Sequence, residues 1–556
     1  MIHRRMRRRL GVKAALLIAA ASVATGAIAQ VGAPSAPLRL RSDYFGYGAS
    51  VSPRLSYTDN IELLPDPLKE GSFIASTLLS GGAIYSANRF TGVLSGDLDL
   101  SFIGEGSDLV VNQRIGAAST TTLVDGLFYF DLAGSTSRQL IGENARFSSN
   151  VNAARGQRAD VHNYSASPYL YRRFAEGQSA ELRYRFSQVF IDDDNAGANP
   201  FAGGLLNDST SHEAIAFYDS GSRLGRFNFT ATGYGNSTVE DGAEFSPRFE
   251  FQQASFTGTA RYALSDRFAL SGAAGYDAID TVAAPGVFDD EALSGFFWRA
   301  GFTARPGRKT DLRLEYGRRY DDDFIDAELG YEISSRLTFR ASAGRSFETR
   351  AQSVASQFRG MGQATLDLAE RLREGDALSA EAAVAASNRL AFGGVNAQTI
   401  GIGATNNAQA ALIGTWERTE ITASANYYDA DFGFRQNTGY GGNLNIRRQV
   451  SRRLTAYGGA FYRHSEVDFD PAVCAASPFL FGFDVNAPFF DPVVACNAFA
   501  IQNGETDTLG GRVGASYQLY RNVSVFGEYA RAERFADSPI LEYAENSVTA
   551  GLTIDF

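Results

Sequence analysis

Three histidines beyond residue 29 are the residues best suited by type to acid–base chemistry. His162 stands apart, whereas His212 lies in the run Asp208-Ser209-Thr210-Ser211-His212-Glu213 and His464 in Arg463-His464-Ser465-Glu466. A serine, a histidine and a carboxylate can together form an activated nucleophile. Neighbours in sequence do not supply the spatial relation that this chemistry requires, and no recognised catalytic motif accompanies them. We therefore expect no catalytic residue and no enzyme activity, with a hydrolase as the weakest alternative.

Acidic runs and a cysteine pair are the other groups with ligand chemistry. Asp192-Asp193-Asp194 and Asp321-Asp322-Asp323 offer oxygen ligands that could bind divalent cations bridging lipopolysaccharide phosphates. Neither run has EF-hand spacing, so solvated loop carboxylates are the favoured interpretation. The two cysteines, Cys474 and Cys496, lie close together in a segment with Pro and Phe, which predicts a loop disulfide in an oxidising compartment. We expect neither a metal site nor a cofactor.

Charged residues that alternate with apolar ones form the set most relevant to function. Placed along the wall of a pore, fixed charges of both signs would tune the passage of ions and solutes. Tyr169, Tyr171 and Tyr457 on the same face could stack on sugar rings. The alternative is that the charges pair across neighbouring strands and fill a closed interior. The residues predicted to face the interior are Arg183, Arg185, Arg299, Arg313, Arg319, Arg340, Arg512, Asp97, Asp99, Glu181 and Glu315.

Alternation with a period of two predicts the strands that must position these charges. It is clear in 94–102, 180–187, 254–262 and 509–518, where one set of alternate residues is apolar and the other polar. An arginine that faces lipid near the bilayer midplane costs about 2–4 kcal/mol. The separation of charged and apolar residues therefore indicates one face toward lipid and one toward an enclosed, polar interior.

Short and long connections alternate between these strands. Tight turns are predicted at 265–267, 306–308, 334–336, 451–453 and 520–522, and long connections near 136–160, 236–250, 279–292, 347–404 and 466–504. Short periplasmic turns and long external loops are typical of outer-membrane barrels. We predict an all-β fold, a transmembrane antiparallel β-barrel over 46–556 with about 22 strands and a range of 16–24. A soluble β-helix or propeller would need a repeat of fixed length, and none is found.

The two ends of the chain carry signals for export and assembly. Six cations between Arg4 and Lys13 precede the apolar run 14–21, which is too short to span a bilayer, and Ala27-Ile28-Ala29 follows. Residues 1–29 are thus a predicted signal peptide, with an uncleaved anchor as the alternative. The last strand alternates and ends on Phe556, which resembles the signal recognised by the outer-membrane barrel assembly machinery. We expect localisation in the bacterial outer membrane, with lipid and lipopolysaccharide as partners.

Composition agrees with a barrel of this kind. The chain has 57 Gly, 41 Phe and 25 Tyr but only 15 Pro, which suits long strands with aromatic girdles. Its net charge of −11 argues against binding to nucleic acid. Residues 30–45 are expected to be a short periplasmic segment, which argues against a plugged, energy-coupled transporter of the TonB-dependent type. Within 348–403, a run with helical spacing at 364–373 predicts a long, partly helical loop, either external or folded into the interior.

The first strand and its exit carry a resemblance to a known family. The segment Val51–Leu63 has an aromatic residue followed by Thr58-Asp59-Asn60-Ile61. It resembles the β-barrel porin 2 family, which includes barrels linked to exopolysaccharide operons and PEP-CTERM/exosortase systems. The resemblance implies a channel for exopolysaccharide secretion or for polar solutes, and it transfers no catalytic residue. Judged by residue type alone, Asp59 and Asn60 are turn residues. The alternative function is a non-conducting, adhesive barrel that binds polysaccharide through external loops.

Overall fold

The structure is a computed structural model, and strands dominate the parts of the chain that it describes. The described residues are 39–42, 45–104, 109–140, 146–148, 150, 152–154, 157–192, 208–241, 248–282, 293–349, 402–431, 435–476, 478, 490–502 and 504–556. The strands are β1 (Arg39–Ser42), β2 (Phe45–Thr58), β3 (Ser72–Ser86), β4 (Phe90–Ile103), β5 (Leu109–Val124), β6 (Phe128–Leu140), β7 (Arg158–Arg173), β8 (Ser179–Asp192), β9 (Ser209–Asp219), β10 (Phe227–Glu240), β11 (Phe249–Ala263), β12 (Phe268–Val282), β13 (Gly295–Ala304), β14 (Thr310–Arg319), β15 (Asp322–Ser334), β16 (Leu337–Thr349), β17 (Ile402–Trp416), β18 (Thr419–Asp431), β19 (Arg435–Gln449), β20 (Leu454–Phe469), β21 (Thr506–Tyr520), β22 (Val523–Ala536) and β23 (Tyr543–Asp555).

The described helices are all short. They are η2 (Asp66–Leu68), η4 (Ala175–Gly177), α5 (Pro471–Ala476) and α6 (Pro492–Gln502). Within the described part of the chain, no helix has both the length and the apolar character needed to cross a bilayer. The helices α5 and α6 belong to the connection between β20 and β21, where Cys474 and Cys496 form a disulfide with their Cα atoms 5.9 Å apart. This is the pairing that the sequence predicts. The predicted helical run at 364–373 lies outside the described residues.

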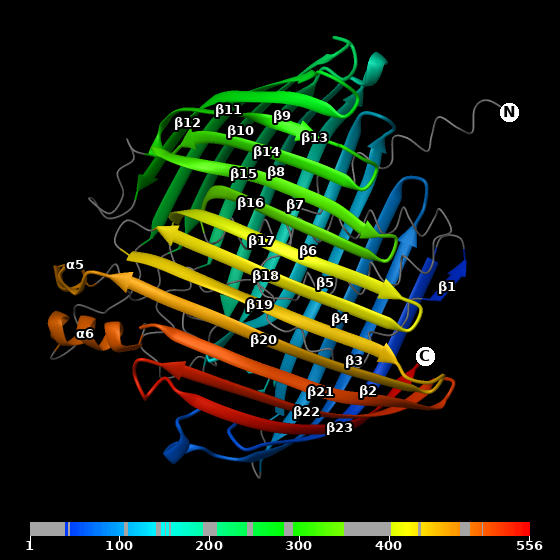
Figure 1. Cartoon of the computed structure of the whole chain (residues 1–556), viewed down its shortest axis with the longest axis vertical. Helices are drawn as coiled ribbons and strands as arrows, with labels where there is room; N and C mark the ends of the chain where they lie inside the picture. The colour runs from blue at the N-terminus through cyan, green and yellow to red at the C-terminus, as the bar shows by residue number, and fades with distance from the viewer. Residues whose placement is uncertain are drawn as a thin grey trace.

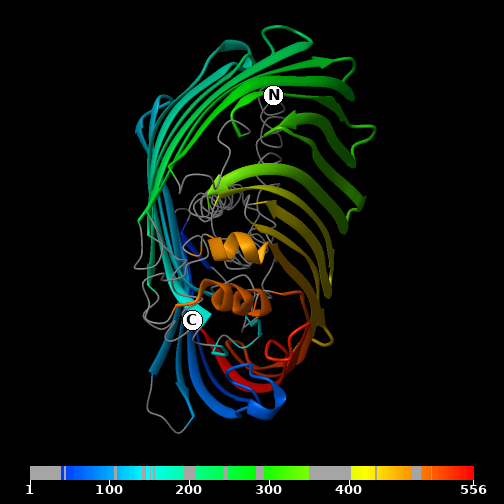
Figure 2. The same ribbon diagram turned by 90° about the vertical axis from the view of Figure 1, so that its left-hand side faces the viewer.

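Strands β2 to β23 close into one antiparallel barrel. Each pairs with its neighbours in the chain, and β23 returns to pair with β2 from Ser50↔Asp555 to Thr58↔Ser547. The ring therefore has 22 strands, and β1 adds to it by pairing with the start of β2. In Figure 1 the strands of the two walls cross at a wide angle, as the tilt of barrel strands requires, and Figure 2 shows the barrel from the side where α5 and α6 lie. The predicted fold class is confirmed.

Each wall strand has an apolar outer face and a polar inner face. In β21, Val513 is 61% exposed on the outer face, whereas its neighbour Arg512 is 6% exposed on the inner face. The strand β2 repeats this pattern, with Leu55 and Tyr57 exposed and Ser52 and Thr58 buried. An exposed apolar face on every wall strand is unfavourable in water and favourable in lipid. The barrel is therefore built to span a membrane.

The tight hairpins gather at the end of the barrel where β2 begins and β23 ends. Each of the five predicted tight turns lies there, between β11 and β12, β13 and β14, β15 and β16, β19 and β20, and β21 and β22. The opposite end carries longer connections, including the one with α5 and α6. One connection at that end is short, because Tyr320 and Asp321 both have positive φ, 57° and 56°, as a two-residue type I′ hairpin requires. The sequence pattern predicted long external loops, and this two-residue connection is an exception to it.

The motif Asp59-Asn60 joins the first barrel strand to the last. The fully buried Asn60 side chain donates to the carbonyl oxygens of Leu64 (2.7 Å) and Ala544 (3.0 Å), and its Oδ1 accepts from the Leu64 amide at 2.8 Å. The Asp59 carboxylate accepts hydrogen bonds from the backbone amide and side chain of Asn546, at 2.7 and 2.8 Å. These turn residues thus fasten β2 to the start of β23 at the external end of the seam.

Replacing Asn60 with alanine is expected to lower the free energy of unfolding by about 2 kcal/mol, because partly buried backbone groups of Leu64 and Ala544 would lose their partner. Urea unfolding of the protein folded in detergent measures the change. The control is Asn445→Ala, since Asn445 is only partly buried and donates one long bond of 3.4 Å to Asn443. Equal losses in the two variants would contradict the inference that Asn60 fastens β2 to β23.

Candidate functional site: the charged inner wall

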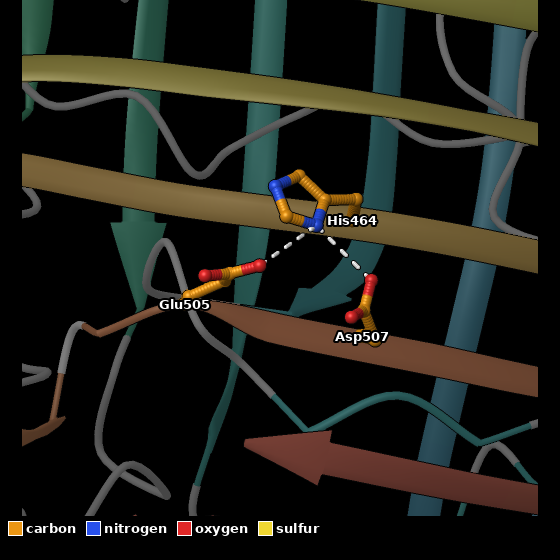
Figure 3. A group of neighbouring side chains, drawn as sticks. All are labelled: His464, Glu505 and Asp507. Atoms are coloured by element: carbon orange, nitrogen blue, oxygen red, sulfur yellow. Dashed lines mark hydrogen bonds and ion pairs between the residues drawn. The ribbon is translucent and has the colours of Figure 1, made fainter. Parts of the chain in front are cut away.

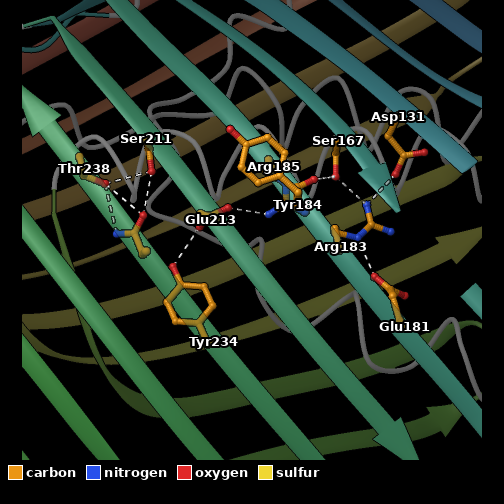
Figure 4. A network of polar contacts seen from close by, with 11 residues as sticks. Asp131, Ser167, Glu181, Arg183, Tyr184, Arg185, Ser211, Glu213, Tyr234 and Thr238 are labelled. Carbon is orange, nitrogen blue, oxygen red and sulfur yellow. Dashed lines mark hydrogen bonds and ion pairs between the residues drawn. The ribbon is translucent and has the colours of Figure 1, made fainter. Parts of the chain in front are cut away.

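The inner wall formed by β6 to β8 holds an arginine with two carboxylates. Arg183 pairs with Asp131 of β6 at 2.8 Å and with Glu181 of its own strand at 2.6 Å. Its guanidinium also lies 3.7 Å from the ring centroid of Tyr169. Figure 4 shows Asp131, Glu181 and Arg183 together on one face of the sheet. Because alternate residues of neighbouring strands share a face, the pleat alone brings them together.

The same face continues across β8 to β10. Arg185 pairs with Glu213 of β9 at 2.9 Å, and the Tyr234 hydroxyl of β10 donates to the other oxygen of Glu213 at 3.0 Å (Figure 4). Glu213 is 4% exposed, so its charge needs both partners. Farther along β9 and β10, Thr238 donates to Ser211 at 2.9 Å. The wall is thus a continuous polar surface rather than a set of isolated charges.

A second charged region spans β12 to β15. Arg299 contacts Glu315 at 3.2 Å and Asp326 at 3.1 Å. Arg313 also contacts Asp326, at 2.8 Å, and reaches Glu328 at 3.1 Å. Two arginines therefore share one aspartate between them, which links the three adjacent strands β13, β14 and β15 through alternating charges.

Near the external end of this region, Arg319 forms a two-point ion pair with Asp277. The distances are 2.7 Å from Nε to Oδ2 and 3.0 Å from Nη2 to Oδ1. The guanidinium also lies 4.6 Å from the ring centroid of Phe297, which comes from the strand between the two partners. The pair bridges β14 to β12 across β13, so it links strands that share no backbone hydrogen bonds.

A third region lies on β2, β4 and β5. Arg54 pairs with Asp99 at 3.2 Å, and Arg114 pairs with Asp97 at 2.9 Å. The Ser101 hydroxyl donates to Asp99 at 2.7 Å. The Arg54–Asp99 pair is almost fully buried, whereas Arg114 and Asp97 are 27% and 22% exposed.

The remaining predicted interior residues lie on the same inner face by register. Arg512 is buried and stands opposite Gly459 and Ala530. Arg340 is exposed and stands opposite Gly330 and Ala411. The eleven predicted residues thus share the inner face, and at least nine of them form ion pairs. Sequence reasoning missed their partners Arg54, Arg114, Asp131, Glu213, Asp277, Asp326 and Glu328, although each follows the same alternation.

Tyrosines line the inner wall close to the tight-turn end. The rings of Tyr129 and Tyr169 stack with centroids 5.2 Å apart, and Tyr171 meets Tyr129 edge-on at 6.5 Å. The predicted Tyr457 lies elsewhere on the inner wall, with its ring over Gly514, where an added Cβ would come within 2.5 Å of it. Aromatic rings and charges together give the wall both stacking surfaces and hydrogen-bonding groups.

An inner segment, residues 146–148, 150 and 152–154, crosses the inside of the barrel. The Phe147 amide donates to the Tyr543 hydroxyl of β23 at 2.9 Å, and the Phe147 ring meets Phe461 of β20 with centroids 5.0 Å apart. Ser148 donates to the buried Glu545 of β23. Asn152 donates to Asn112 of β5 and to Ser101 of β4, at 2.9 and 3.1 Å. The segment therefore fills part of the interior between β4 and β20.

Comparison with known proteins gives likenesses of structure only. No protein-family model and no curated protein matches this chain, so the resemblance to the β-barrel porin 2 family has no such support. Among solved structures, a mutant ferric enterobactin receptor from Pseudomonas aeruginosa has 10% identity and a TM-score of 0.44 over 91% of this chain and 80% of its own. The siderophore receptor PiuA from Acinetobacter baumannii has 10% and 0.44 over 92% and 82%. The ferric-catecholate import receptor Fiu from E. coli K12 has 10% and 0.43 over 94% and 82%.

The histidines considered for catalysis lie on the outer face. His212 Nδ1 is 2.7 Å from the Tyr184 hydroxyl, and its ring lies beside Phe186. His464 pairs with Asp507 at 3.0 Å, but the pleat directs the adjacent, buried Ser465 to the opposite face. The local serine and histidine neighbours therefore do not assemble a nucleophile and base at either position.

Two carboxylates of the second predicted acidic run are exposed and pair with arginines. Asp321 pairs with Arg318 at 2.6 Å, and Asp322 pairs with Arg345 at 2.9 Å. Asp193 and Asp194 lie outside the described residues. A different group, in which Glu505 and Asp507 lie beside His464, was missed by sequence reasoning. The available signal was that these residues flank the connection that contains the disulfide.

Proposed function

We propose that this barrel is a passive outer-membrane channel for polar solutes, with secretion of an exopolysaccharide as its specific form. The observation that supports it is the inner wall, where fixed charges of both signs and tyrosine rings follow one another across adjacent strands. A polar solute leaving water needs replacement hydrogen-bond partners, and such a wall provides them. Sugar hydroxyls suit the carboxylates and guanidiniums, and sugar rings suit the tyrosine faces.

The secretion form draws on the resemblance of segment 51–63 to barrels of exopolysaccharide systems. It carries further proposals with it: cleavage of residues 1–29, delivery by the barrel assembly machinery through Phe556, and insertion beside lipopolysaccharide. Deleting the gene is expected to lower the amount of polysaccharide at the cell surface. Unchanged surface polysaccharide would remove the secretion form and leave general passage of solutes.

Conductance in planar lipid bilayers tests the channel directly. The folded protein is expected to give stepwise ion currents, and Arg114→Gln is expected to shift the reversal potential toward cation selectivity. The reason is that Asp97, which is partly exposed on the inner wall, would lose its compensating charge. The control is Arg318→Gln. Arg318 is paired in register with Trp298, so it lies on the outer face, and it is exposed and pairs with Asp321 at the external end of β14. Zero conductance, or equal shifts in both variants, would contradict the proposal.

A second candidate function is a non-conducting surface barrel that binds polysaccharide through external loops. The inner segment favours it, because Phe147, Ser148 and Asn152 occupy part of the interior and connect β20 and β23 to β5. This candidate predicts zero conductance together with retention of the folded protein on immobilised polysaccharide. Loss of that retention on shortening 348–403, with heat-modifiable gel migration unchanged, would assign binding to that loop.

A further inference from the structure

Three potential metal ligands meet at the end of the barrel that carries α5 and α6. His464 belongs to β20, Asp507 to β21, and Glu505 directly precedes β21 (Figure 3). One ligand atom from each lies within 4.8 Å of the others, the one such group of three in the described part of the chain. His464 Nδ1 is 3.0 Å from Asp507 Oδ1 and 3.9 Å from Glu505 Oε1.

The fold fixes this arrangement through strand register. His464 and Asp507 are direct cross-strand partners in the β20–β21 pair, so their side chains share the outer face. Glu505 lies at the end of the connection that contains the Cys474–Cys496 disulfide, and it returns to the same face beside them. The ligands therefore come from a backbone that is already paired and need little rearrangement to bind an ion.

Neighbouring aromatic residues hold the ligands in place. The Tyr440 ring stacks on His464 with centroids 4.4 Å apart and planes 21° apart. The Tyr462 hydroxyl donates to Asp507 Oδ1 at 2.5 Å. Such contacts around a metal site orient the ligands that touch the ion. The His464 side chain is 8% exposed, whereas Glu505 and Asp507 are 50% and 38% exposed, which leaves an entry path from solvent.

We propose that His464, Glu505 and Asp507 bind a divalent transition-metal ion of the Zn²⁺ class. Tetrahedral bonds of about 2.0–2.2 Å from zinc to imidazole nitrogen and carboxylate oxygen place neighbouring ligand atoms about 3.3–3.6 Å apart. The two measured separations, 3.0 and 3.9 Å, lie on either side of that range. The ion replaces the proton between His464 and Asp507, and water completes its coordination. An imidazole ligand favours such an ion over Ca²⁺ or Mg²⁺, which prefer oxygen.

The test is calorimetric titration of the full-length protein, folded in detergent, with Zn²⁺ alone. One ion per chain is expected to bind. Glu505→Gln and His464→Gln are each expected to weaken binding at least about tenfold. His212→Gln is the matched control, because His212 is also on the outer face but contacts Tyr184 and Phe186 instead of carboxylates. Its affinity should equal that of the unmodified protein.

Heat-modifiable gel migration shows whether each variant has folded. Glu505 precedes β21 and is half exposed, so Glu505→Gln remains informative even if His464→Gln fails to fold. Absence of saturable Zn²⁺ binding would overturn the proposal, as would equal weakening by His212→Gln. Binding of Ca²⁺ as tight as that of Zn²⁺ would also overturn it, since His464 would then have no role as a nitrogen ligand.

Discussion

Replacing Val513 with arginine is expected to lower the free energy of unfolding by about 2–4 kcal/mol when the barrel is folded in lipid vesicles. Val513 is the middle residue of β21 (Thr506–Tyr520) and is 61% exposed on the outer face. An arginine there would lose its hydration in the centre of the bilayer. One residue earlier, the native Arg512 lies on the inner face, so the same side chain type is expected to be costly on one face only.

Urea unfolding in lipid vesicles, followed by the fluorescence of the chain's 2 Trp residues, measures this loss. The matched control is Leu519→Arg, because Leu519 is also exposed but lies one residue from the end of β21. Near the interface an arginine costs about 0–1 kcal/mol, since its head group reaches water. If both variants lose the same free energy, the outer face does not lie in an apolar solvent, and the membrane-spanning interpretation fails.

Alternation along single strands was enough to predict the fold class. The charged residues of 180–187 and the polar residues of 509–518 follow a period of two, and the structure places Arg183 and Arg512 on the inner face accordingly. This success has a simple physical reason. Side-chain direction in a strand depends only on local geometry, so no knowledge of the rest of the chain is needed.

The partners of these residues could not be predicted, because they depend on register and on side-chain length. Arg54 of β2 reaches Asp99 of β4 across the intervening β3, 45 positions along the chain. Asp59 and Asn60 were recognisable as turn residues, but their contacts with Asn546 and Ala544 follow from barrel closure. Such contacts exist only after the first and last strands have met.

The inner segment shows a further limit of pattern analysis. Residues 146–154 have no strand or helix period, so composition suggested only part of a long external loop. Its inward course depends on individual contacts, chiefly those of Phe147 with Tyr543 and Phe461. Conductance distinguishes wall charges that interact with passing solutes from wall charges that pair only with each other.

Replacing Asp277 with asparagine is expected to lower the free energy of unfolding by about 3 kcal/mol. Asp277 is 1% exposed and accepts both hydrogen bonds of the Arg319 fork, so the variant leaves a guanidinium without its counter-charge on the inner wall. The value is at the lower end for a broken buried pair, since the Arg319 side chain remains 27% exposed and retains some hydration. Urea unfolding in detergent measures the loss.

Two further variants separate charge from packing in this pair. Asp125→Asn breaks the Arg89–Asp125 pair, whose side chains are 66% and 69% exposed, and should cost under about 1 kcal/mol. The double variant Asp277→Asn with Arg319→Met should recover much of the loss, because it removes the unpaired charge but keeps an apolar side chain against Phe297. An Asp277→Asn loss no larger than that of Asp125→Asn would mean that water reaches Arg319 freely. The inner wall would then be an open, hydrated surface at this level, which favours the conducting form of the barrel over the closed one.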